Sequence, residues 1–197
     1  MAYHVHKTPG IVLQTLPSGE ANVFLTIFTR ELGLIKATAQ GARLGRSKMR
    51  YGLQKYDVSL FSFVYGKNIW RLTGAVPISS IYYDFKGKKV ELKMIANTCL
   101  LLQRLMTGEE CGTKLFDLFA NAVVFLNKAT LSEEEIGYFE FLFVLRILYN
   151  LGYISGSSGL EVLALGSGWD KEILQNLSSY RREAISAINR AILESQL

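Results

Sequence analysis

The spacing of apolar residues changes near Tyr83, and this change constrains the fold more than any other feature of the sequence. Before Tyr83, apolar and polar residues alternate in short segments that are rich in β-branched and aromatic residues, which is typical of half-buried strands. After Asp84, apolar residues recur every three or four positions, which is typical of amphipathic helices. The sequence therefore predicts a two-domain α+β protein, with one domain over residues 1–83 and a helical domain over residues 84–197.

Short turns join the expected strands, except for one long connection. The strands are expected at residues 7–16, 22–29, 33–41, 55–65 and 67–76. Three of the connections are short enough for hairpins, whereas the third and fourth strands are separated by residues 42–54. Five short antiparallel strands with one long loop match a small closed barrel. We expect a five-stranded β-barrel of the oligonucleotide-binding (OB) type, and an SH3-like barrel is the alternative.

Basic residues are concentrated around the long connection. Residues 36–55, which read KATAQGARLGRSKMRYGLQK, contain six basic residues and no acidic residue. Residues 1–83 carry a net charge of +7, whereas residues 84–197 carry −2. A protein that needs charge only for solubility has no reason to segregate it, so we expect a polyanion such as nucleic acid as the partner. A solvated loop that is charged for solubility alone is the alternative.

The expected nucleic-acid contacts combine cations for phosphates with aromatic rings for base stacking. The first set comprises Lys36, Arg43, Arg46, Lys48 and Arg50, and a second set on the later strands comprises Lys55, Lys67 and Arg71. Tyr51 and Trp70 are the candidate stacking residues. Trp70 lies next to Ile69 and Leu72, so a position in the core is the stronger interpretation for this ring.

A resemblance to a known family adds to this interpretation. The run TPGIVLQTLPSGEANVFLTIFTRELGLIKATAQGAR, continued by GRSKMRYGLQKYD, resembles the RecO family of bacterial recombination mediators, as do RLTGAVPISSIY and FEFLFVLRILYNLGYI further along. The resemblance implies an OB barrel followed by a helical domain. It also implies a non-enzymatic protein that binds single- and double-stranded DNA and anneals strands. With RecR, such a protein helps to load RecA on DNA coated by the single-stranded-DNA-binding protein (SSB) during repair.

The same resemblance implies a receptor for the acidic C-terminal tail of SSB on the helical domain. Such a receptor needs an apolar pocket with cations at its rim. The candidate cations are Arg104, Lys114 and Arg146, because each lies beside a long apolar stretch. For each of them, ordinary charge on a helix surface is the alternative.

Other functional classes have little support in the sequence. There is no GxxxxGK[ST] loop for ATP, and residues 84–197 contain no His that could activate Cys99 or Cys111. No uncharged apolar run is long enough to span a membrane, and we expect a cytoplasmic protein. We therefore expect no enzyme activity and no cofactor. The second hypothesis is an OB- or SH3-like adaptor whose basic loop binds RNA or an acidic protein.

The resemblance also bears on whether this protein binds a structural zinc ion. Many RecO-like proteins follow the LGY sequence with cysteine pairs that bind a structural zinc ion. Here residues 154–168 contain no Cys, so the resemblance implies a shortened, zinc-free variant. Cys99 and Cys111 lie in different predicted helices and cannot complete a tetrahedral site by themselves.

We predict that the purified protein contains no stoichiometric zinc and keeps its fold in a chelator, because no Cys or His set can hold the ion. Elemental analysis and circular dichroism with and without chelator measure these two properties. One zinc ion per chain would show that ligands elsewhere in the sequence had been overlooked.

Overall fold

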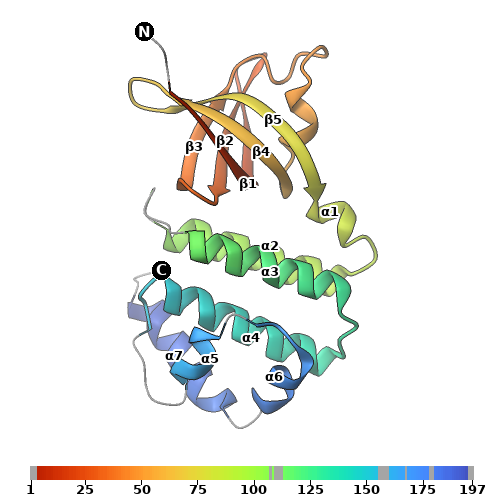
Figure 1. Ribbon diagram of the computed structural model, residues 1–197, viewed down its shortest axis with the longest axis vertical. Coiled ribbons are helices and arrows are strands. Elements are labelled where there is room, and N and C mark those ends of the chain that lie inside the picture. The colour runs from red at the N-terminus through yellow and green to blue at the C-terminus, as the bar shows by residue number, and fades with distance from the viewer. Residues whose placement is uncertain are drawn as a thin grey trace. The chain divides into compact units, whose positions relative to one another are not determined.

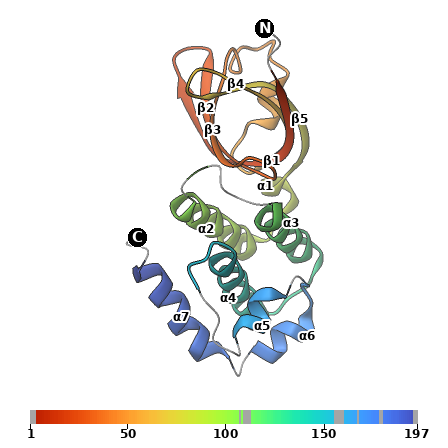
Figure 2. The same ribbon diagram turned by 60° about the vertical axis from the view of Figure 1, so that its left-hand side comes forward.

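A computed structural model describes residues 4–106, 108, 113–154, 160–166, 168–177 and 180–194 (Figures 1 and 2). Contacts divide the chain into two compact units. Unit 1 comprises Met1–Leu92 with Met106–Phe116, and unit 2 comprises Lys93–Leu105 with Asp117–Leu197. Helices α2 (Lys89–Leu105) and α3 (Thr113–Lys128) contribute residues to both units, so the domain boundary after Tyr83 stays a prediction.

Unit 1 contains the five-stranded barrel that the sequence predicts. Its strands are β1 (Val5–Ser18), β2 (Asn22–Thr29), β3 (Gly33–Ala39), β4 (Asp57–Tyr65) and β5 (Trp70–Ser80). The strand order is β1-β2-β3-β5-β4, and β4 pairs back with β1 to close the ring (Figure 1). All pairs are antiparallel except β3 with β5. This order confirms the OB-type barrel and disfavours the SH3-like alternative.

Strand β1 closes the barrel because it pairs with two neighbours. Residues Val5–Ile11 pair with β4, and residues Gly10–Ser18 pair with β2. Gly10 belongs to both ladders, where a Cβ atom would lie 3.0 Å from both the Ile27 side chain and the Phe28 carbonyl oxygen. A register shift follows between Val12 and Gln14. The missing side chain and the bulge let one strand bend from one neighbour to the other.

The inward side chains of the barrel form one apolar core. The alternation that predicts strands appears directly as alternating burial along β3 and β4. Trp70 is part of this core and is only 6% exposed, so the interpretation of Trp70 as a core residue is the one that the structure supports. Its ring packs edge-on against Phe63, with the centroids 6.2 Å apart.

Two short elements of unit 1 were not expected from the sequence. The 3-10 helix η1 (Met49–Gly52) lies in the long connection between β3 and β4. Helix α1 (Ile81–Asp84) follows β5 without a loop, and its residue Ile81 is buried. Both elements are a single turn, too short for the periodicity of apolar residues to reveal.

Helix α4 (Glu133–Asn150) is the central helix of unit 2. It packs against α5 (Leu160–Leu165), α6 (Lys171–Asn176) and α7 (Arg181–Glu194), which lie around it in Figure 2. A capping box begins this helix: the Ser132 hydroxyl accepts from the Glu135 N–H, and the Glu135 carboxylate accepts from the Ser132 N–H. These bonds satisfy two amide groups that the first turn cannot pair internally.

Arg146 of α4 is the one charged residue among the fully buried side chains of the described chain. Its Nε donates to the Leu163 carbonyl (3.0 Å) and its Nη1 to the Gly168 carbonyl (2.7 Å). The guanidinium also lies 4.4 Å from the centroid of the Trp169 ring. Burial lowers the pKa of Arg146 to about 10, against the raising effect of the Asp170 charge, so the side chain stays protonated at neutral pH.

We predict that Arg146→Met lowers the free energy of unfolding by about 3 kcal/mol, because two carbonyls lose a charged donor and the stacked Trp169 loses its partner. Arg104→Met is the matched control: Arg104 is exposed on α2, and we expect a change within about 0.5 kcal/mol. Urea unfolding followed by circular dichroism measures both. Equal stability of the two variants would mean that desolvation of the guanidinium cancels the stabilisation from its contacts.

Candidate nucleic-acid interface

The connection between β3 and β4, residues 40–56, is called the basic loop below. Its first residues are fixed to the turn between β1 and β2. The Gly41 N–H donates to the Asn22 side chain (2.9 Å), and the Arg43 N–H donates to the Ala21 carbonyl (2.9 Å). Ala42, between them, is 2% exposed and packs in the barrel core. The basic loop therefore leaves the barrel in a fixed direction.

The last residues of the basic loop are fixed to β1. The Thr15 hydroxyl donates to the Leu53 carbonyl (2.7 Å), and the Tyr56 N–H donates to the Val12 carbonyl (2.7 Å). Leu53 is 3% exposed and belongs to the barrel core. With both ends attached to buried apolar residues, the basic loop is a folded part of the barrel rather than a solvated tether.

The charged residues of this region point to solvent. All nine residues expected to contact nucleic acid are exposed, namely Lys36, Arg43, Arg46, Lys48, Arg50, Tyr51, Lys55, Lys67 and Arg71. The nearest acid in sequence, Asp57, is instead 5% exposed and accepts a hydrogen bond from the Gln54 N–H (2.8 Å). All the charged side chains of the basic loop that face solvent are therefore cationic.

Hydrogen bonds within the barrel place some of these cations. The Arg43 Nη1 donates to the Gly19 carbonyl (2.9 Å), and the Arg71 Nη2 donates to the Gln40 side chain (3.2 Å). Arg71 on β5 thus lies beside the start of the basic loop. This proximity follows from the parallel pairing of β3 with β5, which aligns Thr38 with Arg71. A polyanion bound at the start of the basic loop can therefore contact Arg71 of β5 as well as the cations of the loop itself.

At the other end of the basic loop, a groove of about 790 Å³ opens between η1, the end of β5 and α1. Arg50, Tyr51 and Lys55 from the expected set line it. Tyr82 and Tyr83 also line it, although they were not expected as site residues. The last expected strand ended at residue 76, and the proximity of Tyr82 and Tyr83 to Tyr51 depends on how the barrel closes.

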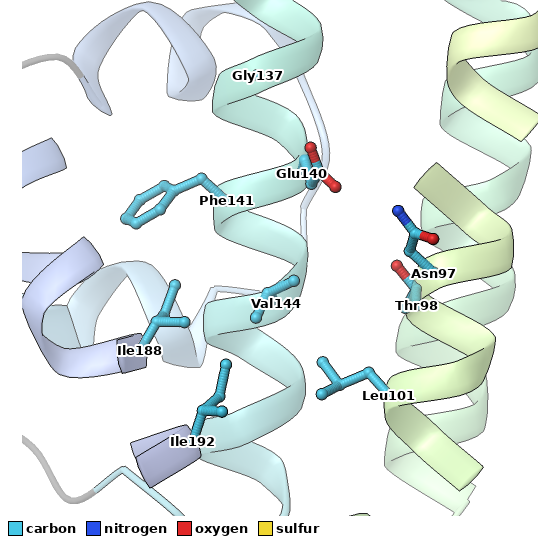
Figure 3. A pocket seen from close by; sticks show the side chains of 9 residues that line it. All are labelled: Asn97, Thr98, Leu101, Gly137, Glu140, Phe141, Val144, Ile188 and Ile192. Atoms are coloured by element: carbon cyan, nitrogen blue, oxygen red, sulfur yellow. The ribbon is translucent and has the colours of Figure 1, made fainter. Parts of the chain in front are cut away.

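The expected partner-binding cations of the helices differ in their exposure. Arg104 and Lys114 are exposed, whereas Arg146 is buried and its donors are used inside unit 2, so it is no surface cation. Unit 2 does contain a groove of about 400 Å³ between α2, α4 and α7 (Figure 3). Its lining is Asn97, Thr98, Leu101, Gly137, Glu140, Phe141, Val144, Ile188 and Ile192. The one charged residue of this lining is an acid, and none of the three expected cations belongs to it.

The described residues contain no group of three His, Cys, Asp or Glu side chains that could hold a metal ion. Cys99 is buried in α2, and Cys111 lies outside the described residues, as does part of the stretch 154–168. No helix in the described ranges is long and apolar enough to cross a membrane.

Comparisons with known proteins agree with the fold of unit 1. A family model described as "Recombination protein O N terminal" matches residues 1–81. The chain is similar to the DNA repair protein RecO of Acetivibrio thermocellus, with 30% identity over 147 residues, or 75% of this chain and 57% of that protein. The DNA repair protein RecO of Heliobacterium modesticaldum is 31% identical over 149 residues, or 76% of this chain and 52% of that protein. The chain spans about half the length of these curated relatives.

Gly52 packs the end of η1 against β4 and β5, which allows a test of how firmly the basic loop is attached. A Cβ atom at Gly52 would lie 2.5 Å from the Ser59 hydroxyl, which now donates to the Gly52 carbonyl, and 3.3 Å from the Pro77 ring. We predict that Gly52→Ala lowers the free energy of unfolding by about 1–3 kcal/mol, measured by urea unfolding.

Gly45→Ala is the matched control, because a Cβ atom there meets nothing within 4 Å, and we expect a change within about 0.5 kcal/mol. If both variants were as stable as the natural protein, η1 would not be packed against the barrel in solution.

Proposed function

Because this chain belongs to the RecO family through residues 1–81, we propose that it binds DNA and acts in recombination and repair without catalysing a reaction. The observation that carries the proposal is the exposure of all eight selected cations of an OB-type barrel, five of which lie on one anchored loop. The printed names of the relatives, which are DNA repair proteins, support the cellular role.

Phosphate contacts provide the physical basis of the proposed binding. Each phosphate that is neutralised by Lys or Arg releases a condensed counterion, so affinity depends steeply on salt and only weakly on sequence. Among these cations, Arg43 and Arg71 lie at the start of the basic loop, and Arg50 and Lys55 lie at its end. Such a distribution suits a backbone that passes along the loop rather than a single bound anion.

Strand annealing follows from the same chemistry as part of the proposal. A surface that neutralises phosphates on two strands lowers the repulsion between them and leaves base pairing to determine the sequence match. On the family resemblance, we also propose that the protein works with RecR and SSB in the bacterial cytoplasm to load RecA. The acidic SSB tail would dock on the helical part of the chain, where exposed Arg104 of α2 and exposed Lys114 of α3 remain the candidate cations.

The alternative, an adaptor that binds RNA or an acidic protein through the basic loop, uses the same cations. A strand-annealing assay with complementary DNA separates the two functions, since an adaptor has no reason to accelerate duplex formation. RNA of the same sequence and an acidic peptide serve as competitors. Displacement of DNA by the peptide at equal charge concentration would favour the adaptor.

We predict that a fourfold alanine variant at Arg43, Arg46, Lys48 and Arg50 binds DNA more weakly by orders of magnitude. Each lost phosphate contact reduces the slope of log affinity against log salt by about 0.7 for single strands and about 0.9 for duplex. The variant should fold, because these four side chains are exposed. Fluorescence anisotropy with labelled DNA over a salt series measures both quantities.

The matched control removes the same charge outside the basic loop by replacing Lys86 in the turn before α2, Lys89 and Lys93 of α2, and Lys128 of α3, which are all exposed. We expect this variant to retain the salt slope of the natural protein. An equal loss of affinity in the two variants would show that overall charge, and not the basic loop, determines binding.

A further inference from the structure

The groove at the end of the basic loop exposes an unusual number of aromatic side chains. Tyr51, Tyr82 and Tyr83 are 65%, 60% and 73% exposed and all line the same cavity of about 790 Å³. This volume is within the range of about 300–1,000 Å³ that is common for ligand sites. We call these three side chains, together with Arg50 and Lys55, the tyrosine groove. Solvent-facing aromatic rings gathered in a concave site are typical of binding surfaces.

Packing of the barrel does not require these rings. Two side chains attach α1 to the rest of unit 1. They are Ile81, at the start of α1, and Phe85, just after its end, which are 2% and 1% exposed. Tyr82 and Tyr83 lie between them and point away from the core. The centroids of the two rings are 5.6 Å apart and their planes lie at 82°, so the edge of one ring faces the other. A flat ligand can stack on one ring while its edge meets the other.

Cations border the rings. The Arg50 guanidinium lies 4.8 Å from the centroid of the Tyr51 ring and donates to its hydroxyl (2.9 Å). The Lys55 ammonium lies 4.9 Å from the centroid of the neighbouring Tyr56 ring. The carboxylate that lines the groove, Asp57, is buried and hydrogen-bonded to the Gln54 N–H. The solvent side of the groove thus presents aromatic faces beside positive charge.

The backbone of Tyr56 holds the two sides of the groove together. Its φ of 72° lies in the left-handed region, which is costly for a residue with a bulky side chain. The Tyr56 N–H donates to the Val12 carbonyl, and its own carbonyl accepts from the Ile81 N–H at the start of α1 (3.1 Å). The end of the basic loop and the helix that carries Tyr82 and Tyr83 are therefore joined through one residue, and the groove is preformed.

We infer that the tyrosine groove is a subsite for the unpaired bases of single-stranded nucleic acid, an inference that rests on the proposed DNA-binding function. Unpaired bases stack on the tyrosine faces, and Arg50 and Lys55 contact the flanking phosphates. In a duplex the base faces are already stacked on one another, so only a single strand can use the rings. The groove gives the protein a means to distinguish single strands that charge alone does not provide.

The test compares an oligothymidylate with a strand of the same length and charge whose sugars carry no base. Anisotropy titrations at about 0.1 M salt use the natural protein, a triple variant with Tyr51, Tyr82 and Tyr83 replaced by Leu, and the same triple replaced by Phe. Leu retains apolar volume without a flat face, whereas Phe retains the face without the hydroxyl. All three positions are exposed, so we expect both variants to fold.

We expect the natural protein to prefer the base-bearing strand at least about fivefold for each stacked base. The Phe variant should keep this preference, the Leu variant should reduce it to about one, and affinity for the abasic strand should be equal in all three. Equal affinity of the natural protein for both strands would overturn the inference and leave phosphate binding intact. A loss of affinity for both strands alike in the Leu variant would also overturn it.

Two further outcomes refer to the proposed function itself. If the natural protein bound neither strand, the DNA-binding proposal would fail and the subsite with it. If an oligoglutamate peptide bound the natural protein, lost affinity in the Leu variant and was not displaced by the oligothymidylate, the groove would be a protein-docking site instead.

Discussion

The double pairing of β1 is the constraint on which the rest of unit 1 depends. One strand forms ladders with both β2 and β4, and it can do so because Gly10 has no side chain where the two ladders meet. The ring is completed on its other side by a short parallel pairing of β3 with β5, which aligns Ala37 with Trp70 and Thr38 with Arg71. The same closure positions the basic loop, since its start is fixed to the β1–β2 turn and its end to Val12 and Thr15 of β1.

Anchoring at both ends gives the basic loop a property that charge alone would not. A flexible cationic segment pays a conformational entropy cost when it is ordered on a polyanion, whereas a loop with Ala42 and Leu53 in the barrel core is ordered before binding. The backbone that carries its cations is then held in place before binding. The tyrosine groove adds rings at one end of the basic loop, so that electrostatic and stacking contacts would act on the same strand.

Unit 2 contains a buried charged side chain, Arg146, which is stabilised by hydrogen bonds and an aromatic ring. Arg146 lies inside a cluster of aromatic and aliphatic side chains, where a bare guanidinium would be very unfavourable. Two carbonyls outside α4 and the face of Trp169 compensate, and these groups belong to the segment around α5 and α6. One charged side chain thus holds short, weakly helical elements against the central helix, which apolar contacts alone would specify less uniquely.

The sequence by itself determined the features that depend on neighbouring residues. Alternation located all five strands, with differences of a few residues at their ends. The cations of the basic loop were predicted as nucleic-acid contacts because no acidic residue lies among them in the sequence, and all of these cations are exposed. The tertiary structure alone decided which side chains are buried and which segments meet. It buried Trp70 and Arg146 and brought Tyr82 and Tyr83 to Tyr51, because burial and proximity depend on chain closure between residues far apart in sequence, which no local pattern records.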